Sequence, residues 1–346
     1  MKPLKLLFIE PPESRRVGGV ETALAGLAGA LRGAGMEVRR AETAAPAVLD
    51  GVDAVHFHGL WERGHSALRR VCMERHLPFL VSPHGMLEPW ALAHKRWKKL
   101  PYFYLRERPG LRRAAAILAT SEAEARNLRR WFAPEQVRTL PLGLPESPGP
   151  DHDGARRALG WSPEERVVVF LSRLHAKKGL HVLVAAWPRI AARAGSPVRL
   201  VIVGDGEDDY VEPLRRAARA SGAHVDWAGP RWGDAKWPWL QGADVFCLPT
   251  FSENFGLVVP EALLVGTPVV TTPGTPWGEL SDGLPVTITE PTEAGLTEAL
   301  LAALRADRPG DGRRRLTHAR VAERFGWSRL AKDYVDLYRS ITVAQP

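Results

Sequence analysis

Short apolar runs alternate with helix-like stretches along the whole chain. In the first half the runs cover 4–9, 54–57, 79–82, 114–119 and 137–140. In the second half they cover 167–171, 200–203, 225–228, 245–248 and 268–271. Each run is short enough to be a buried strand, and stretches with helical spacing, such as 20–32, separate them. This alternation predicts an α/β protein with parallel sheets that carry helices on both faces.

A stretch rich in proline and glycine, residues 141–154, divides the chain near its middle. With 346 residues the chain is long enough for two domains. We predict a first domain over 1–145, a second over 146–326 and a terminal helix over 327–346. Asp151-His152-Asp153 resembles an Asp-x-Asp metal motif, but it falls in the linker, away from any strand end, and we expect it to bind no metal.

The composition is that of a globular protein with a basic surface. The formal charge is +8 and the sequence pI is about 9.8, which favours an anionic partner such as a nucleotide, a phosphate or an acidic lipid surface. Cys72 and Cys247 allow no disulfide framework, and the opening apolar run is too short for a signal peptide. We expect a cytoplasmic protein without nucleic-acid binding, because no zinc finger or RNA-binding motif accompanies the charge.

Two carboxylates bracket a glycine-bearing turn after the apolar run 245–248. These are Glu253 in the turn and Glu261 near the start of the following helix. Ligands of open α/β sheets bind beyond the carboxyl ends of the strands. We expect the amides of Phe255, Gly256 and Leu257 to point at an anion there, because the first N–H groups of a helix lack intrahelical partners.

A cation pair follows the strand predicted over 167–171. Arg173 can form a fork with phosphate oxygens, and Lys178 supplies a point charge. Such a pair can neutralise a departing diphosphate in place of a divalent metal. A glycine turn that includes Gly204 follows the next predicted strand.

These motifs resemble those of one enzyme family. Glu-x7-Glu with Asn-Phe-Gly (253–261), Ser-Arg-Leu-x-x-x-Lys-Gly (172–179) and Ser-Pro-His-Gly-Met (82–86) look like the signatures of the family 4 retaining glycosyltransferases. The resemblance extends over nearly the whole chain. It implies the GT-B fold, with two Rossmann-like domains facing a central cleft. The first domain would bind an acceptor, the second a nucleotide-diphosphate sugar, and the C-terminal helix would cross back to the first domain.

The resemblance also implies roles for individual residues. The catalytic set would be Arg173, Lys178, Glu253 and His84, with no metal and no cofactor. The donor-binding set would be Gly18, Gly19, Gly204, Asn254, Phe255, Gly256, Leu257 and Glu261. Transfer would proceed by front-face attack with retention, and the acceptor would be a glycan or a lipid-linked glycan in the synthesis of a surface polysaccharide or lipopolysaccharide. His58, at the end of an earlier strand, is a weaker candidate for acceptor contact, and a packed loop histidine is the favoured alternative.

Residues 87–113 combine aromatic residues at helical spacing with many basic ones. Trp90 and Trp97 recur with Tyr104, while Lys98 and Lys99 belong to the basic positions. A basic helix with aromatic residues is typical of membrane surfaces, and this one would dock on acidic phospholipid at the inner face of the membrane. The alternative is a domain helix whose aromatic residues lie in the core.

Two other functions remain open at this stage. One is a sugar-nucleotide epimerase or a phosphorylase of the same fold, although no lysine context for pyridoxal phosphate is present. The other is a non-catalytic module that binds lipid or nucleic acid through the basic 87–113 segment.

Overall fold

The computed structural model describes residues 2–12, 18–42, 45–93 and 95–343. The chain forms two compact units. Unit 1 comprises Met1–Pro145 with Phe325–Pro346, and unit 2 comprises Glu146–Arg324. The first predicted boundary, after residue 145, matches the division between the units. The second was predicted after residue 326, but the chain returns to unit 1 at Phe325, two residues earlier.

The sheet of unit 1 has six parallel strands in the order β2-β1-β3-β4-β5-β6. These are β1 (Lys5–Ile9), β2 (Glu37–Ala41), β3 (Ala54–His58), β4 (Phe79–Ser82), β5 (Ala116–Ala119) and β6 (Val137–Thr139). The sequence pattern did not predict β2. This strand lies at the edge of the sheet and only Val38 is buried, so its sequence lacks an apolar run.

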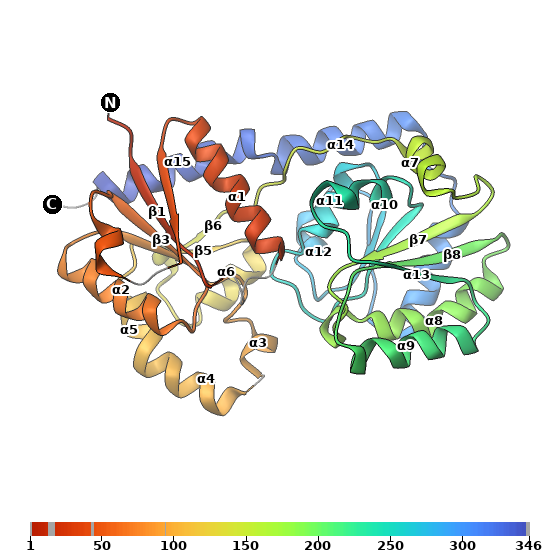
Figure 1. Ribbon diagram of the computed structural model, residues 1–346, viewed down its shortest axis with the longest axis horizontal. Helices are drawn as coiled ribbons and strands as arrows, with labels where there is room; N and C mark the ends of the chain where they lie inside the picture. Colours follow the sequence, from red (N-terminus) through yellow and green to blue (C-terminus); the bar gives the residue numbers. More distant parts are fainter. Residues whose placement is uncertain (1, 13–17, 43–44, 94, 344–346) are drawn as a thin grey trace. The chain divides into compact units, whose positions relative to one another are not determined.

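Helices cover both faces of this sheet (Figure 1). The longer ones are α1 (Gly18–Gly33), α2 (Arg63–Glu74), α6 (Glu122–Leu128) and α15 (Trp327–Val343). Successive residues of a strand point to opposite faces. Accordingly Leu6 and Phe8 of β1 join the core cluster that α1 and α15 complete, while Leu7 and Ile9 join the cluster on the other face.

The last helix, α15, is an integral part of unit 1. Tyr334, Val335 and Tyr338 are buried in the same core cluster as Phe8. Trp327, at the start of the helix, fits only because two neighbours are glycines. A Cβ on Gly26 would lie 2.2 Å from the indole nitrogen, and one on Gly143 would lie 2.3 Å from a ring carbon.

The basic aromatic segment forms a broken series of short helices. These are α3 (Pro89–Ala93), α4 (Arg96–Tyr102), a π-helical turn η3 (Phe103–Glu107) and α5 (Arg108–Leu111). The turn is anchored by a fully buried ion pair between Glu107 and Arg69 of α2. The segment is broken before Arg96, where Lys95 has a φ of +57°, while Pro101 lies inside α4 and the helical turns continue to Leu111.

The sheet of unit 2 also has six parallel strands, in the order β12-β11-β10-β7-β8-β9. These are β7 (Arg166–Leu171), β8 (Val198–Val203), β9 (Val225–Gly229), β10 (Val245–Leu248), β11 (Val269–Thr271) and β12 (Val286–Ile288). Its helices are α7 (His152–Leu159), α8 (Leu180–Arg193), α9 (Asp208–Ala220), α10 (Trp237–Gln241), α11 (Val258–Leu264), α12 (Trp277–Leu280), α13 (Glu293–Arg305) and α14 (Asp311–Phe325). The predicted α/β class, with two parallel sheets and flanking helices, is confirmed.

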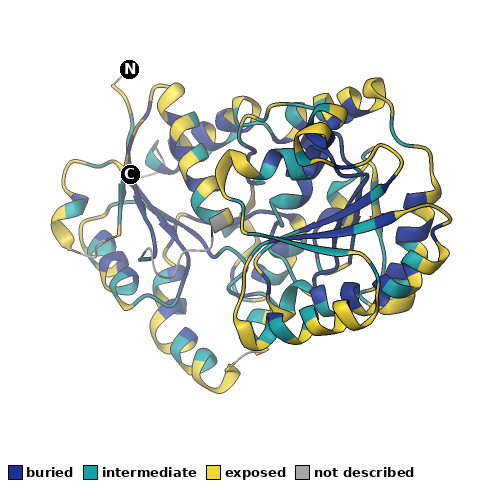
Figure 2. Cartoon of the chain, turned by 45° about the vertical axis from the view of Figure 1, so that its right-hand side comes forward, coloured by how far each residue is buried: buried dark blue, intermediate teal, exposed yellow. Residues whose placement is uncertain are grey.

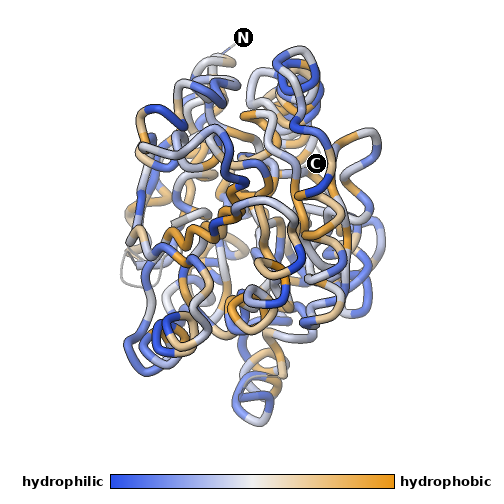
Figure 3. Tube along the Cα trace, turned by 90° about the vertical axis from the view of Figure 1, so that its right-hand side faces the viewer, coloured by the Kyte–Doolittle hydropathy of each residue, from blue (hydrophilic) through white to orange (hydrophobic). Residues whose placement is uncertain are grey.

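Burial follows the hydropathy of the sequence. The central strands are mostly dark blue in Figure 2, edge strands such as β9 are only partly buried, and the outer faces of the helices are yellow. Apolar stretches gather in the interior in Figure 3, while hydrophilic ones lie mainly on outer helices and turns. Across the described ranges, no helix combines the length and apolar character that crossing a bilayer demands.

The Asp-His-Asp segment is the start of a helix and not part of an extended linker. Asp151 is the N-cap of α7 and accepts a hydrogen bond from the backbone N–H of Gly154 at 3.0 Å. Within the part of the chain that the structure describes, no group of three or more His, Cys, Asp or Glu side chains is arranged to hold a metal ion.

Candidate active site

The sheet of unit 2 contains a point at which its strand order reverses. From β7 the chain moves outward to β8 and β9, and it then returns to β10 on the opposite side of β7. The loops that leave β7 and β10 therefore diverge at the carboxyl edge of the sheet. In open α/β sheets this switch point is where ligands bind.

Lys178 and Glu253 meet at this switch point as an ion pair. Lys178 comes from the loop after β7 and Glu253 from the loop after β10. Their side chains are 16% and 12% exposed, so the pair is largely withdrawn from water but still reachable. The backbone ties the two loops together, because the carbonyl of Lys177 accepts from the N–H of Phe251 at 2.8 Å and from the hydroxyl of Thr250 at 3.0 Å.

Glycines let the loop backbones approach closely here. Gly179 has a φ of +72°, and a Cβ on it would lie 1.9 Å from the carbonyl oxygen of Pro249. Gly274, after β11, accepts from the N–H of Glu253 at 2.6 Å through its carbonyl oxygen. Three strand ends are thus packed together, which holds the backbone of Glu253 in place.

Arg173 lies on the same loop as Lys178 and has an exposed side chain. The loop is fixed on both sides of it. The N–H of Leu174 donates to the carbonyl of Asp205 at 2.6 Å, and a Cβ on Gly204 would lie 1.9 Å from the carbonyl oxygen of Ser172. Gly204 is predicted to bind the donor. Packing alone already requires glycine at this position, because a side chain would clash with the Ser172 carbonyl.

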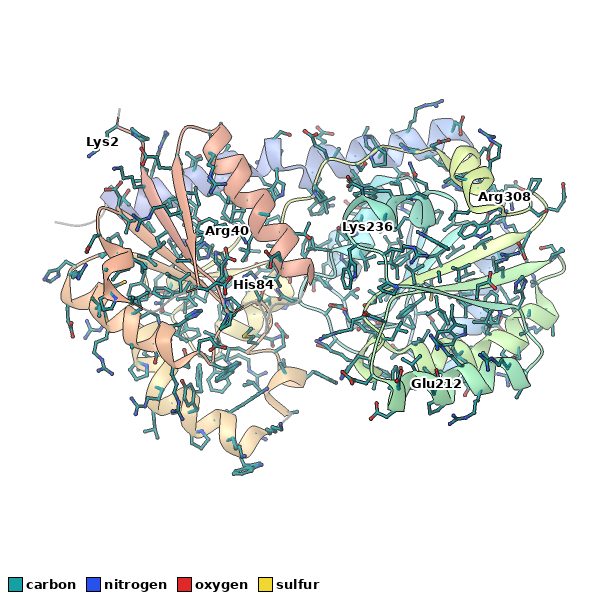
Figure 4. All side chains as sticks on the ribbon, in the orientation of Figure 1. Lys2, Arg40, His84, Glu212, Lys236 and Arg308 are labelled. Carbon is teal, nitrogen blue, oxygen red and sulfur yellow. The ribbon has the colours of Figure 1, made fainter. Side chains whose placement is uncertain are left out.

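Glu261 forms a second lysine–glutamate pair, with Lys236. Lys236 Nζ lies 2.7 Å from Glu261 Oε1, and Glu261 is only 5% exposed. Burial raises the pKa of Glu261, and the Lys236 ammonium opposes that shift. Lys236, labelled in Figure 4, was missed at the sequence level. It lies 25 residues earlier in the chain, in no recognisable motif.

The turn between the two glutamates is held by Trp277. Its indole N–H donates to the carbonyl of Phe255 at 2.7 Å, and the two rings pack edge to face at 5.5 Å. Phe255 is buried, which gives its side chain a structural role. Helix α11 begins at Val258, so the amides of 255–257 precede the helix, as does Asn254.

In unit 1, His84 follows the end of β4 and lies next to His58 at the end of β3. His58 Nδ1 is 3.2 Å from His84 Nε2. Burial lowers the pKa of His84 to about 4. Figure 4 labels His84 and also Arg40 of β2, which pairs with Glu10 through a 2.8 Å contact. His58 is 1% exposed, so the expectation that it reaches an acceptor is wrong; it packs beneath the surface.

The remaining predicted residues are more scattered. Gly18 and Gly19 open α1, immediately after a stretch outside the described residues. The side chains of Trp90 and Trp97 are 43% and 75% exposed. The alternative that their rings lie in the core is therefore wrong. Lys98 packs over the Trp97 ring at 4.6 Å.

Lys99 does not belong to an outward basic face. Its ammonium donates to the carbonyl of Ala91 and lies 5.9 Å from the centre of the Trp61 ring. Lys99 is therefore half-buried, and its contact with a membrane stays a prediction.

Family comparisons match both units. A family model described as "Glycosyl transferases group 1" matches residues 165–306, and one described as "Glycosyl transferase 4-like domain" matches residues 43–143. A D-inositol 3-phosphate glycosyltransferase of Segniliparus rotundus is 31% identical over 248 residues, which cover 65% of this chain and 52% of the relative. A phosphatidyl-myo-inositol mannosyltransferase of Mycobacterium tuberculosis is 32% identical over 225 residues, 62% of this chain and 57% of the relative. The chain thus spans little more than half the length of these relatives.

Solved structures share the fold. Sucrose-phosphate synthase from Thermosynechococcus elongatus has a TM-score of 0.73 at 19% identity, with all of both chains covered. Anabaena HepE in complex with UDP and glucose has a TM-score of 0.76 at 19% identity, covering 97% of this chain and all of that one. The motifs, the two family matches and the shared architecture lead to one conclusion: the chain belongs to the family 4 glycosyltransferases, which have the GT-B fold.

Proposed function

We propose that unit 2 binds a nucleotide-diphosphate sugar and that the enzyme transfers the sugar to an acceptor hydroxyl. The observation that carries this proposal is the meeting of Lys178 and Glu253 at the switch point, with the exposed Arg173 on the same loop as Lys178. A cation and a carboxylate side by side suit a ligand with both phosphate oxygens and sugar hydroxyls. The structural neighbour HepE binds UDP-glucose, which agrees with a ligand of this class.

The leaving diphosphate is neutralised by Arg173 and Lys178. Arg173 forms a fork with two phosphate oxygens, and Lys178 places a compact positive charge beside the breaking bond. Fixed charges of this kind stabilise the transition state because they need no reorganisation during the reaction. We propose that they do so without a divalent metal ion.

The stereochemical course follows from the arrangement of groups expected around the sugar. The acceptor oxygen bonds to the anomeric carbon on the face that the diphosphate leaves, and the acceptor proton passes to a departing phosphate oxygen. The configuration is thereby retained. Glu253 accepts hydrogen bonds from sugar hydroxyls, Glu261 accepts from the ribose, and His84 of unit 1 contacts the transferred sugar.

For the acceptor we propose a glycan or lipid-linked glycan used in the synthesis of a cell-surface polysaccharide. The names of the relatives point to polar and lipid-borne inositol acceptors in those proteins, namely inositol 3-phosphate and phosphatidyl-myo-inositol. A hydroxyl group on a polyol next to a phosphate is common to both.

A lipid-borne acceptor agrees with the exposed basic aromatic segment of unit 1. Trp97 and Leu105 are 75% and 77% exposed, beside the exposed Lys98 and Arg106. Exposed large apolar side chains among basic ones are typical of helices that lie on acidic bilayers. We propose that this segment contacts the acidic surface of the membrane.

Two experiments test the proposal. The melting temperature is measured with UDP, GDP, ADP and dTDP, because a ligand that binds only the folded chain raises its stability. Release of the same nucleoside diphosphate from its sugar conjugate is then measured with and without acceptor glycans. Acceptor-dependent release supports transfer. Interconversion of the sugar nucleotide without any acceptor favours an epimerase, and no thermal shift with any of the four nucleotides contradicts the proposal.

A further inference from the structure

Three histidines lie together at the carboxyl edge of the unit 1 sheet. His56 and His58 share one face of β3, and their ring centres are 3.9 Å apart. His84 comes from the turn after the neighbouring strand, β4, where His58 pairs in register with Ser82. The rings of His58 and His84 have centres 5.4 Å apart and planes within 20° of each other. Two imidazoles side by side in nearly one plane have this geometry, which suits a direct N–H···N hydrogen bond.

The His58 ring is held rigidly by its other neighbours. His56 uses both of its ring nitrogens, since Nδ1 lies 2.7 Å from the hydroxyl of Tyr338 and Nε2 lies 2.8 Å from the hydroxyl of Ser82. His56 is therefore fixed against one side of His58. The ring of Phe8 packs against His58 at 5.0 Å.

The turn that carries His84 is also held in an unusual conformation. His84 has a φ of +50°, which is uncommon for a residue other than glycine. The next residue keeps the turn in place, because the N–H of Gly85 donates to the buried carboxylate of Glu124 at 2.8 Å. Such backbone strain persists where the surroundings over-determine it and often marks a ligand site.

The direction of the His58–His84 hydrogen bond follows from what lies around His58. Burial lowers the pKa of both rings, so each carries one proton. Among the described residues His58 Nε2 is buried and has no hydrogen-bond partner. If His84 donated, this nitrogen would be a buried N–H without an acceptor, which is rare and costly. If His58 donates through Nδ1–H, the buried N–H without an acceptor lies on His84 Nδ1 instead. A ligand can supply an acceptor for this one, because His84 lies in the half-buried turn after β4, whereas His58 is only 1% exposed. The direction from His58 to His84 is therefore favoured when a ligand is bound.

We propose that His58 is a positioning residue that donates to His84 Nε2 and so fixes the proton of His84 on Nδ1. His84 then offers its ligand a hydrogen-bond donor. Its Nδ1 is buried and finds no partner in the described part of the chain, so a ligand oxygen would satisfy it. This inference rests on the proposed function, in which that oxygen belongs to the transferred sugar.

The tautomer of His84 can be read directly. Long-range proton–nitrogen NMR spectra of the uniformly labelled protein are compared with those of His84→Gln to assign the His84 ring. We expect the proton on Nδ1 in the wild type with the nucleotide sugar bound. His58→Asn places an amide near the position of Nδ1 and retains that tautomer, whereas His58→Leu loses it. Ser82→Ala, which removes a contact of His56 only, is the matched control and leaves the His84 signals in place.

Transfer kinetics give the second measurement. We expect His58→Leu to lower kcat by about 10- to 100-fold, by analogy with the loss of a hydrogen-bond partner of a metal-binding histidine. KM for the donor changes much less, and His58→Asn restores most of the rate. A merely structural role for His58 would instead give equal losses in both variants.

The outcomes separate this inference from the proposed function. A wild-type His84 protonated on Nε2, or identical His84 tautomers in His58→Leu and His58→Asn, overturns the positioning role. The NMR measurement of the His84 tautomer does not require enzymatic activity. For the wild-type protein it also does not depend on whether a variant folds. If the tautomer is as expected but no nucleotide sugar supports transfer, the proposed function fails while the assignment of the proton stands.

Discussion

Lys178 and Glu253 form an ion pair across the ends of two neighbouring strands, although 75 residues separate them in the chain. Each has a role of its own expected from its motif, the lysine toward a diphosphate and the glutamate toward a sugar. The ion pair couples the two side chains before any ligand arrives. The lysine is held by the residue that is expected to hold the sugar, so the two halves of the donor would be bound by one preformed unit.

This coupling predicts a non-additive loss of stability. Lys178→Met and Glu253→Gln should each lower the free energy of unfolding by about 1–3 kcal/mol, because each leaves the partner's polar group largely buried and unpaired. The double variant should lose less than the sum of the two. Urea denaturation measures all three.

The exposed pair Arg193–Glu298 supplies the control in the same unit. Its side chains are 46% and 68% exposed, so Arg193→Met should cost less than about 1 kcal/mol. Strict additivity of Lys178→Met and Glu253→Gln would show that the contact contributes nothing in solution.

Replacing Arg173 should abolish most of the activity and little of the stability. The side chain is exposed, and its role is proposed to lie with the leaving diphosphate. Arg173→Ala should lower kcat by about 100- to 1,000-fold, the cost of one preorganised donor at a developing charge. Arg173→Lys should recover part of it, because a lysine keeps the charge but not the fork. Near-wild-type transfer by a folded Arg173→Ala protein would remove Arg173 from this role.

Lys236 should keep Glu261 ionised. Burial raises the pKa of Glu261 and Lys236 opposes that effect, so Lys236→Met should shift the pKa further upward. The carboxylate, as the better acceptor for ribose hydroxyls, would then be lost as pH falls. Calorimetric titration with the nucleoside diphosphate from about pH 8 to about pH 6 should show a steeper loss of affinity in Lys236→Met than in wild type. Lys236→Arg should behave like the wild type, and an equal pH dependence in all three would refute this role.

The buried histidines of unit 1 should make the protein sensitive to acid. Burial lowers the pKa of His65 and of His84 to about 4, and the pKa values of His56 and His58 are also well below 6.5. Because the unfolded chain binds these protons first, stability is complete above about pH 6.5 and falls as the pH drops toward about 4. Each such histidine contributes a slope of about 1.4 kcal/mol per pH unit in that window.

The contribution of one histidine can be isolated. His84→Gln should flatten the dependence of unfolding free energy on pH by one proton between about pH 6 and about pH 5. Chemical denaturation at several pH values measures both slopes. An unchanged slope would mean that His84 is charged in the folded protein.

The basic aromatic segment should bind acidic vesicles through Trp97 and Lys98. Trp97→Ala and Lys98→Glu should each reduce co-sedimentation with vesicles that contain phosphatidylglycerol, and high salt should reduce it too, because screening weakens surface charge attraction. Trp232→Ala is the matched control, since Trp232 is 67% exposed but lies in unit 2. Equal effects of the two tryptophan substitutions, or equal binding to neutral phosphatidylcholine vesicles, would contradict a specific membrane face.

The sequence by itself determined the fold class and most of the strands. Buried parallel strands such as β7 and β10 are continuous apolar runs, because both of their faces are covered, and this signal is local. The motif residues Arg173, Lys178, Glu253 and Glu261 were also predicted from the sequence, because they belong to recognisable motifs that follow the strands β7 and β10.

Only the tertiary structure decided which side chains meet. The pairs Lys178–Glu253 and Lys236–Glu261, and the contact of His58 with His84, join residues 25 to 75 positions apart. No local pattern contains that information, because strand order in the sheet brings these ends together. The exposure of Trp97 and the burial of His58 were likewise decided by packing, since an aromatic or a histidine at helical or strand spacing suits either environment.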